Sequence, residues 1–127
     1  MKTPYLHEWL FEHAERQPDA PAVATPTSRL SYRELADRVR TLAAHLAATG
    51  VVSGDRILLA LPNAPATVVA GLAIHALGAT AVEANREWGA ETLAGIVRQS
   101  GVRQAFIWGR DARTWKTACA DQPLERL

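Results

Sequence analysis

The residues of this chain that could do chemistry are few and widely separated. The histidines, at positions 7, 13, 45 and 75, share no spacing of three or four residues, so we expect no zinc site. No serine lies in the Gly-x-Ser-x-Gly sequence of a nucleophile elbow. The single cysteine, Cys119, excludes an internal disulfide and a cysteine metal cluster, and it favours a reducing compartment.

Nucleotide-binding loops of the familiar kinds are also missing. No Gly-x-Gly-x-x-Gly sequence follows an expected strand, and no Gly-x-x-x-x-Gly-Lys-Ser/Thr loop is present. Ligands of open α/β sheets bind beyond the carboxyl ends of the strands, where this chain has Pro62-Asn63, Asn85-Arg86 and Gly109-Arg110. A phosphoacceptor site would need an acidic cluster at these strand ends, and we expect only Glu83 to lie close. From the residues alone we therefore assign no catalytic, cofactor-binding or metal-binding residue.

The composition is that of one compact domain without a strong charge. At 127 residues, 48% hydrophobic, with a net charge of +1, the chain can hold a core, and neither disorder nor nucleic-acid binding is indicated. The tryptophans, at positions 9, 88, 108 and 115, are not interleaved with basic residues, so we interpret them as core and interface residues rather than a base-stacking platform. Met1 to Pro4 leads into a polar helix without the apolar core of a signal peptide, and we expect a cytoplasmic protein.

The elements that must position any site are organised around a stretch without charged residues, Ile57 to Val82. A membrane span needs about 20 uninterrupted apolar residues, and Pro62 and Pro65 interrupt this stretch early. We therefore predict no membrane span, but a buried strand, a helix and a second strand.

The helix within this stretch, Ala64 to Leu77, has an unusual surface for a helix packed on a sheet. Its polar residues are Thr67 and His75, whereas a face in contact with water normally carries Lys or Glu. We expect the outer face of this helix to be covered, either by later parts of the chain or by a partner.

The whole pattern predicts an α/β fold of three layers, with a parallel sheet of about three core strands flanked by helices, preceded by an N-terminal helix and a short β-hairpin. The expected segments are a helix over 1–17, a hairpin over 20–31, a helix over 32–49, a βαβαβ unit over 56–108 and a tail over 109–127, in which Trp115, Ala118 and Cys119 are spaced to line a short helix.

Helix ends are marked by recognisable residues. Ser31 and Glu34 form the pattern of a capping box, and Asn63 is the expected N-cap of the central helix, with Pro65 in its first turn. Glycines at positions 50, 78 and 101 are expected to end the three helices of the central region.

Several short stretches, in order, match the motifs of one enzyme superfamily. They are Pro18 to Val23, Leu30 to Leu35, Gly54 to Ile57, Leu61 to Asn63, and Ala76 to Ala79 followed by Asn85. Over about Leu6 to Ile107 the chain resembles the N-terminal portion of the adenylate-forming, or AMP-binding, ligases: acyl-CoA synthetases, acyl-AMP ligases and peptide-synthetase adenylation domains. Arg86-Glu87-Trp88 departs from that pattern, which usually has a proline and an aromatic residue after the asparagine.

The resemblance implies that the complete enzyme activates a carboxylic acid with ATP and Mg as an acyl-adenylate, and transfers it to the thiol of CoA or of a carrier protein. The phosphate loop, the nucleotide contacts, the acid pocket and the catalytic lysine of that superfamily all follow the matched region. We therefore expect this chain alone to bind no cofactor and to be inactive.

Two hypotheses about the chain's role follow. It is the N-terminal subdomain of a ligase, completed by the remainder of the ligase or by a complementing chain, or it is a free-standing interaction module that binds a protein partner without catalysis. The acid and its acceptor stay open, as does the reason why the chain stops at Leu127.

Overall fold

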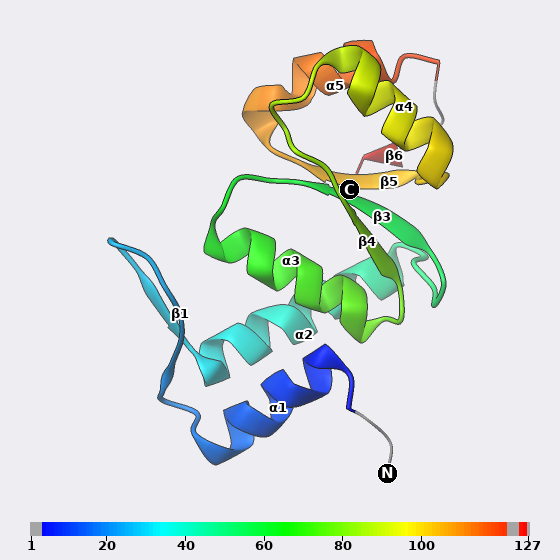
Figure 1. The fold of residues 1–127 in the computed structure, drawn as a ribbon. Helices are drawn as coiled ribbons and strands as arrows, with labels where there is room; N and C mark the ends of the chain where they lie inside the picture. Colours follow the sequence, from blue (N-terminus) through cyan, green and yellow to red (C-terminus); the bar gives the residue numbers. More distant parts are fainter. Residues whose placement is uncertain (1–3, 122–124, 127) are drawn as a thin grey trace.

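The computed structural model describes residues 4–121 and 125–126, so positions 1–3 of the expected first helix and positions 122–124 and 127 of the expected tail lie outside the described residues. Figure 1 shows the elements in chain order. They are α1 (Leu6–Arg16), β1 (Pro21–Ala24), β2 (Arg29–Ser31), α2 (Tyr32–Ala48), β3 (Arg56–Ala60), α3 (Pro65–Ala76), β4 (Thr80–Glu83), α4 (Ala90–Ser100), β5 (Gln104–Ile107), the 3₁₀ helix η1 (Gly109–Asp111), α5 (Ala112–Ala118) and β6 (Glu125–Arg126).

The main sheet has the strand order β4-β3-β5-β6, and all of its pairs are parallel. Leu58, at the centre of β3, lies opposite Val82 on one side and Ala105 on the other. β1 and β2 form a separate antiparallel hairpin. The predicted α/β class, with its parallel sheet, N-terminal helix and hairpin, is confirmed. β6 is an addition, and its two residues are too few to give a hydrophobic pattern in the sequence.

Helices cover both faces of the sheet, which gives three layers (Figure 1). Successive side chains of a strand point to opposite faces, and Ile57 accordingly joins the core cluster under α1, α2 and α3, whereas Leu58 joins the cluster under α4 and α5. Both residues are fully buried. The uninterrupted apolar run of β3 therefore reflects a strand that is covered on both sides.

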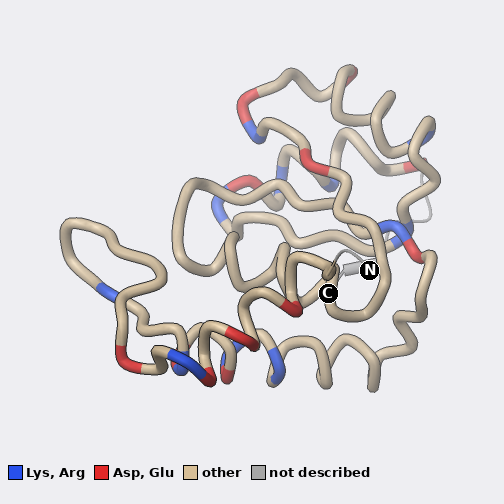
Figure 2. Tube along the Cα trace, turned by 60° about the horizontal axis from the view of Figure 1, so that its bottom comes forward, with Lys and Arg blue, Asp and Glu red and all other residues tan. Residues whose placement is uncertain are grey.

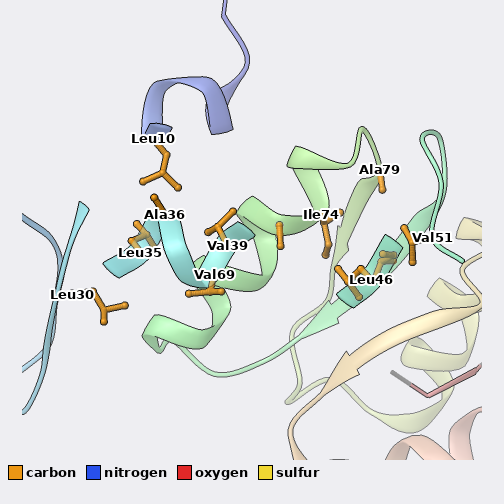
Figure 3. Close-up of a cluster of buried hydrophobic side chains, with 12 residues drawn as sticks. Leu10, Leu30, Leu35, Ala36, Val39, Leu46, Val51, Val69, Ile74 and Ala79 are labelled. Carbon is orange, nitrogen blue, oxygen red and sulfur yellow. The ribbon is translucent and has the colours of Figure 1, made fainter. Parts of the chain in front are cut away.

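The outer face of α3 is covered by α1 and α2, which precede it in the chain. Figure 3 shows Leu10 on α1 pointing toward Ala36 on α2, and Val69 lying between α2 and α3. The expectation that later parts of the chain cover this face is therefore wrong, whereas a partner over the α3 residues left exposed stays a prediction. It failed because the sequence pattern of α2 indicates an apolar stripe but does not say which neighbour the stripe meets. Val68, 39% exposed, is the large apolar residue of α3 left at the surface.

The helix ends agree with most of the predicted signals. The backbone N–H of Glu34 donates to Ser31 Oγ (3.2 Å) and the N–H of Ser31 donates to Glu34 Oε2 (2.8 Å), which confirms the capping box at the start of α2. Gly78 has φ +73°, and a Cβ there would lie 2.6 Å from Ser53 Oγ, so glycine is required by both conformation and space. Gly50 and Gly101 also have positive φ values beyond their helices.

The prediction for the start of α3 is wrong in one detail. Ala64, not Asn63, is the N-cap, and it offers no side-chain hydrogen bond. Pro65 occupies the first turn as predicted, where its missing N–H costs nothing. The hydroxyl of Thr67 donates to the carbonyl oxygen of Pro62 (2.5 Å), and this bond fastens the first turn to the preceding loop.

Candidate functional site

The carboxyl edge of the sheet carries a cavity of about 530 Å³ between the loops that follow β3 and β4. This is the place where an open parallel sheet binds its ligands. We call it the strand-end cleft, and its lining residues are Leu59, Leu61, Pro62, Asn63, Thr67, Glu83, Ala84, Asn85, Arg86 and Glu87. The two loops predicted to flank a site, at Pro62-Asn63 and Asn85-Arg86, therefore do lie together.

The loop after β4 is held in shape by its own side chains. Asn85 Oδ1 accepts the backbone N–H of Glu87 (2.9 Å), and the N–H of Trp88 donates to the carbonyl oxygen of Asn85 (3.1 Å). An asparagine that bonds two residues ahead forms an Asx-turn. Asn85 is thus a turn-forming residue in this structure, and its side-chain oxygen is used within the loop.

Arg86 ties the same loop to the segment that follows β5. Its Nε and Nη2 atoms donate to Asp111 Oδ2 (2.7 Å) and Oδ1 (3.2 Å), a two-bond arrangement in which both side chains are partly buried. The hydrogen bonds that Arg86 donates to Asp111 raise the pKa of Arg86, so the guanidinium stays charged. Its positive charge is matched by Asp111.

The sequence did not reveal this pair. The sequence marks Arg86 only as a departure from the superfamily pattern and Gly109-Arg110 only as the end of a strand, and it gives no signal for Asp111. The two partners are 25 positions apart in the chain. Only the strand order, which brings the ends of β4 and β5 to the same edge, places them together.

The strand-end cleft does not form a phosphate cradle. The groups that could approach a polyphosphate are the carboxylates of Glu83 and Glu87, a guanidinium already bound by Asp111, and the side-chain amides of two asparagines. A phosphate loop instead presents a run of backbone N–H groups from glycines together with a lysine. Throughout the described ranges, no three His, Cys, Asp or Glu side chains lie close enough to hold a metal ion. The ATP and Mg implied by the resemblance therefore do not fit the residues at this cleft.

The remaining chemically capable residues are not gathered at the cleft. His7 and His13 lie on α1, His45 on α2 and His75 on α3. Cys119 is buried beside Trp115 in the cluster under α4 and α5, and burial raises the pKa of its thiol. Lys, Arg, Asp and Glu are interspersed along the chain rather than collected in a region of one sign (Figure 2).

Of two further cavities, one lies away from the cleft and the other borders it at Leu61. One of about 410 Å³ is at the opposite edge of the sheet, where Arg56 Nη1 donates to the carbonyl oxygen of Ser100 (2.7 Å) at the end of α4. The other, of about 800 Å³, is a groove between α2, α3 and the sheet. Its lining residues are Asp37, Arg38, Thr41, Leu42, His45, Leu61, Ala66, Val69, Ala70 and Phe106.

Comparison with known proteins identifies the family. The description "AMP-binding enzyme" belongs to the family whose sequence profile matches residues 10–127. The chain belongs to this family. It corresponds to the N-terminal part of the AMP-binding ligases, as the resemblance of its motifs predicted.

Relatives of this AMP-binding chain are much longer proteins. It is 35% identical over 113 residues to phenyloxazoline synthase MbtB of Mycobacterium sp. (strain MCS), a match that covers 89% of this chain and 10% of MbtB. It is 34% identical to phosphinothricin tripeptide synthetase PhsC of Streptomyces viridochromogenes, covering 95% of this chain and 12% of PhsC. The chain thus spans about a tenth of the length of these curated relatives.

Solved structures share its fold. A benzoate CoA ligase from Burkholderia xenovorans LB400 aligns with a TM-score of 0.87 and 25% identity, over 94% of this chain and 24% of that one. VinN aligns with a TM-score of 0.90 at 20% identity, over 99% of this chain and 33% of VinN, which shows the common fold. Within the described part of the chain, no helix is both long and apolar enough to cross a bilayer.

Proposed function

We propose that this chain is the N-terminal subdomain, over residues 1–127, of an ATP-dependent ligase that activates a carboxylic acid as an acyl-adenylate and passes it to a thiol. The observation that carries the proposal is the family match over residues 10–127, together with the close structural likeness to a benzoate CoA ligase. The thiol belongs to CoA or to a carrier protein, and the protein acts in the cytoplasm.

The role of the chain within such a ligase is structural. Its strand-end cleft offers carboxylates and a neutralised guanidinium rather than a phosphate cradle. ATP and Mg would therefore be held by the rest of the ligase, and this chain alone is inactive. No residue of the chain is assigned to catalysis, to cofactor binding or to a metal.

The acid is not fixed by the relatives. One structural neighbour is a benzoate CoA ligase, and another, VinN, was solved with L-aspartate. An aromatic acid and an amino acid are chemically distant, so the fold of this region is compatible with either substrate class.

The experiment is an ATP–pyrophosphate exchange assay over a panel of aromatic acids, fatty acids and amino acids. We expect no exchange by the chain alone, and acid-dependent exchange when the polypeptide encoded after residue 127 is supplied with it. Exchange by the purified chain alone would refute the structural role. No exchange by the combination with any acid would refute the ligase.

A second candidate is an interaction module derived from such a ligase, which binds a protein partner without catalysis. The observation that favours it is the exposure of Tyr5, Leu6 and Trp9 on one end of α1. Exposed apolar side chains that lie close together are typical of protein contacts. This candidate predicts a stable complex in which no acid stimulates exchange.

A further inference from the structure

The groove between α2, α3 and the sheet is an apolar surface that the chain does not fill. We call it the α2–α3 groove. Its walls are formed by Leu42 of α2, Val69 and Ala70 of α3, Leu61 after β3 and Phe106 of β5, and its volume is about 800 Å³. Leu42, Leu61 and Phe106 are only half-buried. Covering apolar surface stabilises a complex by about 25 cal/mol for each Å² that is removed from water.

The polar groups of the groove lie along one helix. Asp37, Arg38, Thr41 and His45 follow one another at steps of one, three and four residues on α2, and all four are exposed. Thr41 Oγ1 already donates to the carbonyl oxygen of Asp37 (2.9 Å). The walls opposite, on α3 and the sheet, are hydrocarbon. A polar rim beside an apolar floor is the anatomy of a protein contact.

The rim also shows which charge an occupant should carry. Asp37 is paired with Arg40. Arg38 makes no ion pair with the carboxylates that the structure describes, although its positive charge helps to lower the pKa of Glu34. An acidic residue of a partner could therefore approach Arg38 at low cost, since exposed pairs need little desolvation.

We infer that the α2–α3 groove holds an apolar segment of the remaining ligase polypeptide, with an acidic residue beside Arg38. This inference rests on the proposed function. In the benzoate CoA ligase and VinN the matched region is a third of the chain or less, so the same fold there is embedded in a polypeptide at least three times as long. That polypeptide is the source of the covering segment.

A second copy of the chain would fit the groove less well. The groove is concave, and the exposed apolar residues on α1 that could enter it, Tyr5, Leu6 and Trp9, lie on a different surface. Such a contact would join two different surfaces, and unless both copies made it reciprocally it would extend head-to-tail. Open-ended self-association would then be expected at high concentration.

The first experiment places the photo-crosslinking residue p-benzoylphenylalanine at Ala66, in the mouth of the groove, in the protein produced by its natural host. The matched control has the same residue at Ala44, which is exposed on α2 and is not part of the groove. After irradiation, mass spectrometry identifies the captured peptide. We expect position 66 to capture a peptide of the ligase polypeptide beyond residue 127, and position 44 to capture none.

The second experiment measures association of the chain with the polypeptide encoded after residue 127. The variants are Ala66→Glu, which introduces a carboxylate into the groove, and Ala44→Glu as the matched control. A carboxylate at Ala66 lies in the first turn of α3, where it suits the helix dipole, so the chain should still fold. We expect Ala66→Glu to weaken association at least about tenfold, because it buries an unpaired charge, and Ala44→Glu to leave it unchanged.

Several outcomes would overturn the inference. Capture of peptides from the chain itself at position 66 would identify a second copy as the occupant. Capture of an unrelated protein, or equal association of both glutamate variants, would show that the ligase polypeptide does not use the groove. Failure of the exchange assay with normal, groove-dependent association would instead refute the proposed function and leave the contact standing.

Discussion

The two faces of the sheet bury their cores in different ways. On one face, α1, α2, α3 and the hairpin contribute many buried residues of moderate size, among them Leu10, Leu35 and Ile74 (Figure 3). On the other face, α4 and α5 pack around one large side chain, Trp115, which is 2% exposed. Both cores draw on several elements, but the second contains one side chain, Trp115, that is much larger than its neighbours.

The difference predicts how much stability each face loses when a buried side chain is shortened. The first core loses a fraction of its contacts when one side chain is shortened, and its neighbours can partly close the space. In the second core no neighbour is large enough to fill the space of the indole if it is removed. The face under α4 and α5 should therefore be the more sensitive of the two.

The most damaging change should be Trp115→Ala. We expect it to lower the free energy of unfolding by about 3–5 kcal/mol, since removal of a buried Trp leaves a large cavity. Urea unfolding followed by circular dichroism measures the loss. The control is Trp108→Ala, whose side chain is 42% exposed and should cost about 1 kcal/mol or less. Equal losses for the two variants would contradict the central role of Trp115.

The reactivity of the Cys119 thiol is an independent measure of how well the core under α4 and α5 is packed. Burial raises the pKa of this thiol, so in the intact chain it should react slowly with a thiol reagent at pH 8. In Trp115→Phe, which refills part of the space, labelling should speed up less than in Trp115→Ala. Among residues 4–121 and 125–126 the indole N–H of Trp115 has no hydrogen-bond partner, so phenylalanine loses volume but none of the described hydrogen bonds.

On the other face, Leu46→Ala should cost about 2–3 kcal/mol, at the lower end of the range for buried leucines, because the surrounding side chains can partly close the space. Leu46 is 1% exposed on α2. The surface residue Val68, replaced by alanine, should change the free energy of unfolding by about 0.5 kcal/mol or less. A loss at Leu46 as large as that at Trp115 would break the comparison between the faces.

A smaller effect is expected at the start of α2, where Ser31→Ala should cost about 1 kcal/mol. The hydrogen bonds from Ser31 lower the pKa of Glu34 in the folded chain. Glu34 therefore contributes stability at pH values above its unfolded pKa of about 4.3, and this contribution is lost as the pH falls through the folded value. Ser31→Ala keeps the backbone N–H that is the main cause of the lowered pKa and removes only the side-chain contribution, so it should weaken the acid dependence in part. Ser31→Thr, which keeps a hydroxyl, should retain it in full.

The smallest global effect should come from the pair Arg86–Asp111, which joins two loops rather than two core elements. A double-mutant cycle with Arg86→Ala and Asp111→Ala should show a favourable coupling that weakens as salt is added. Hydrogen exchange at the amides of Glu87 and Trp88 should speed up in either single variant. Arg86→Lys should behave like Arg86→Ala, since an ammonium cannot donate in the two-bond geometry. Unchanged exchange in all variants would show that the pair does not hold the loop.

The face under α1, α2 and α3 was largely predictable from the sequence. The stripe of α2, the capping box at Ser31 and the apolar run of β3 all follow from local periodicity and known end signals. The covering of α3 by α1 and α2 was not predictable, because a stripe says that a helix is buried and not by what. The mistaken N-cap at Asn63 has a similar cause, since Pro65 fixes the first turn one residue later than the asparagine suggests.

The strand-end cleft was predictable in position but not in chemistry. Topology places Asn63 and Asn85 at one edge of the sheet, as expected for parallel strands. Whether their side chains stay available depends on local bonds such as the Asx-turn of Asn85, which spacing alone does not show. The pair between Arg86 and Asp111 joins two loops, and no periodicity links such positions.

The position of β3 between β4 and β5 has a consequence for the newborn chain on the ribosome. β3 gains its second neighbour only when β5 has been made, about 45 residues after β3 itself. Until then the inner surfaces of α2 and α3 have no finished sheet to cover, and such exposed apolar surface attracts other chains. Slow translation before residue 104 should therefore favour aggregation. A chaperone that shields α3 during this interval should raise the yield of folded protein.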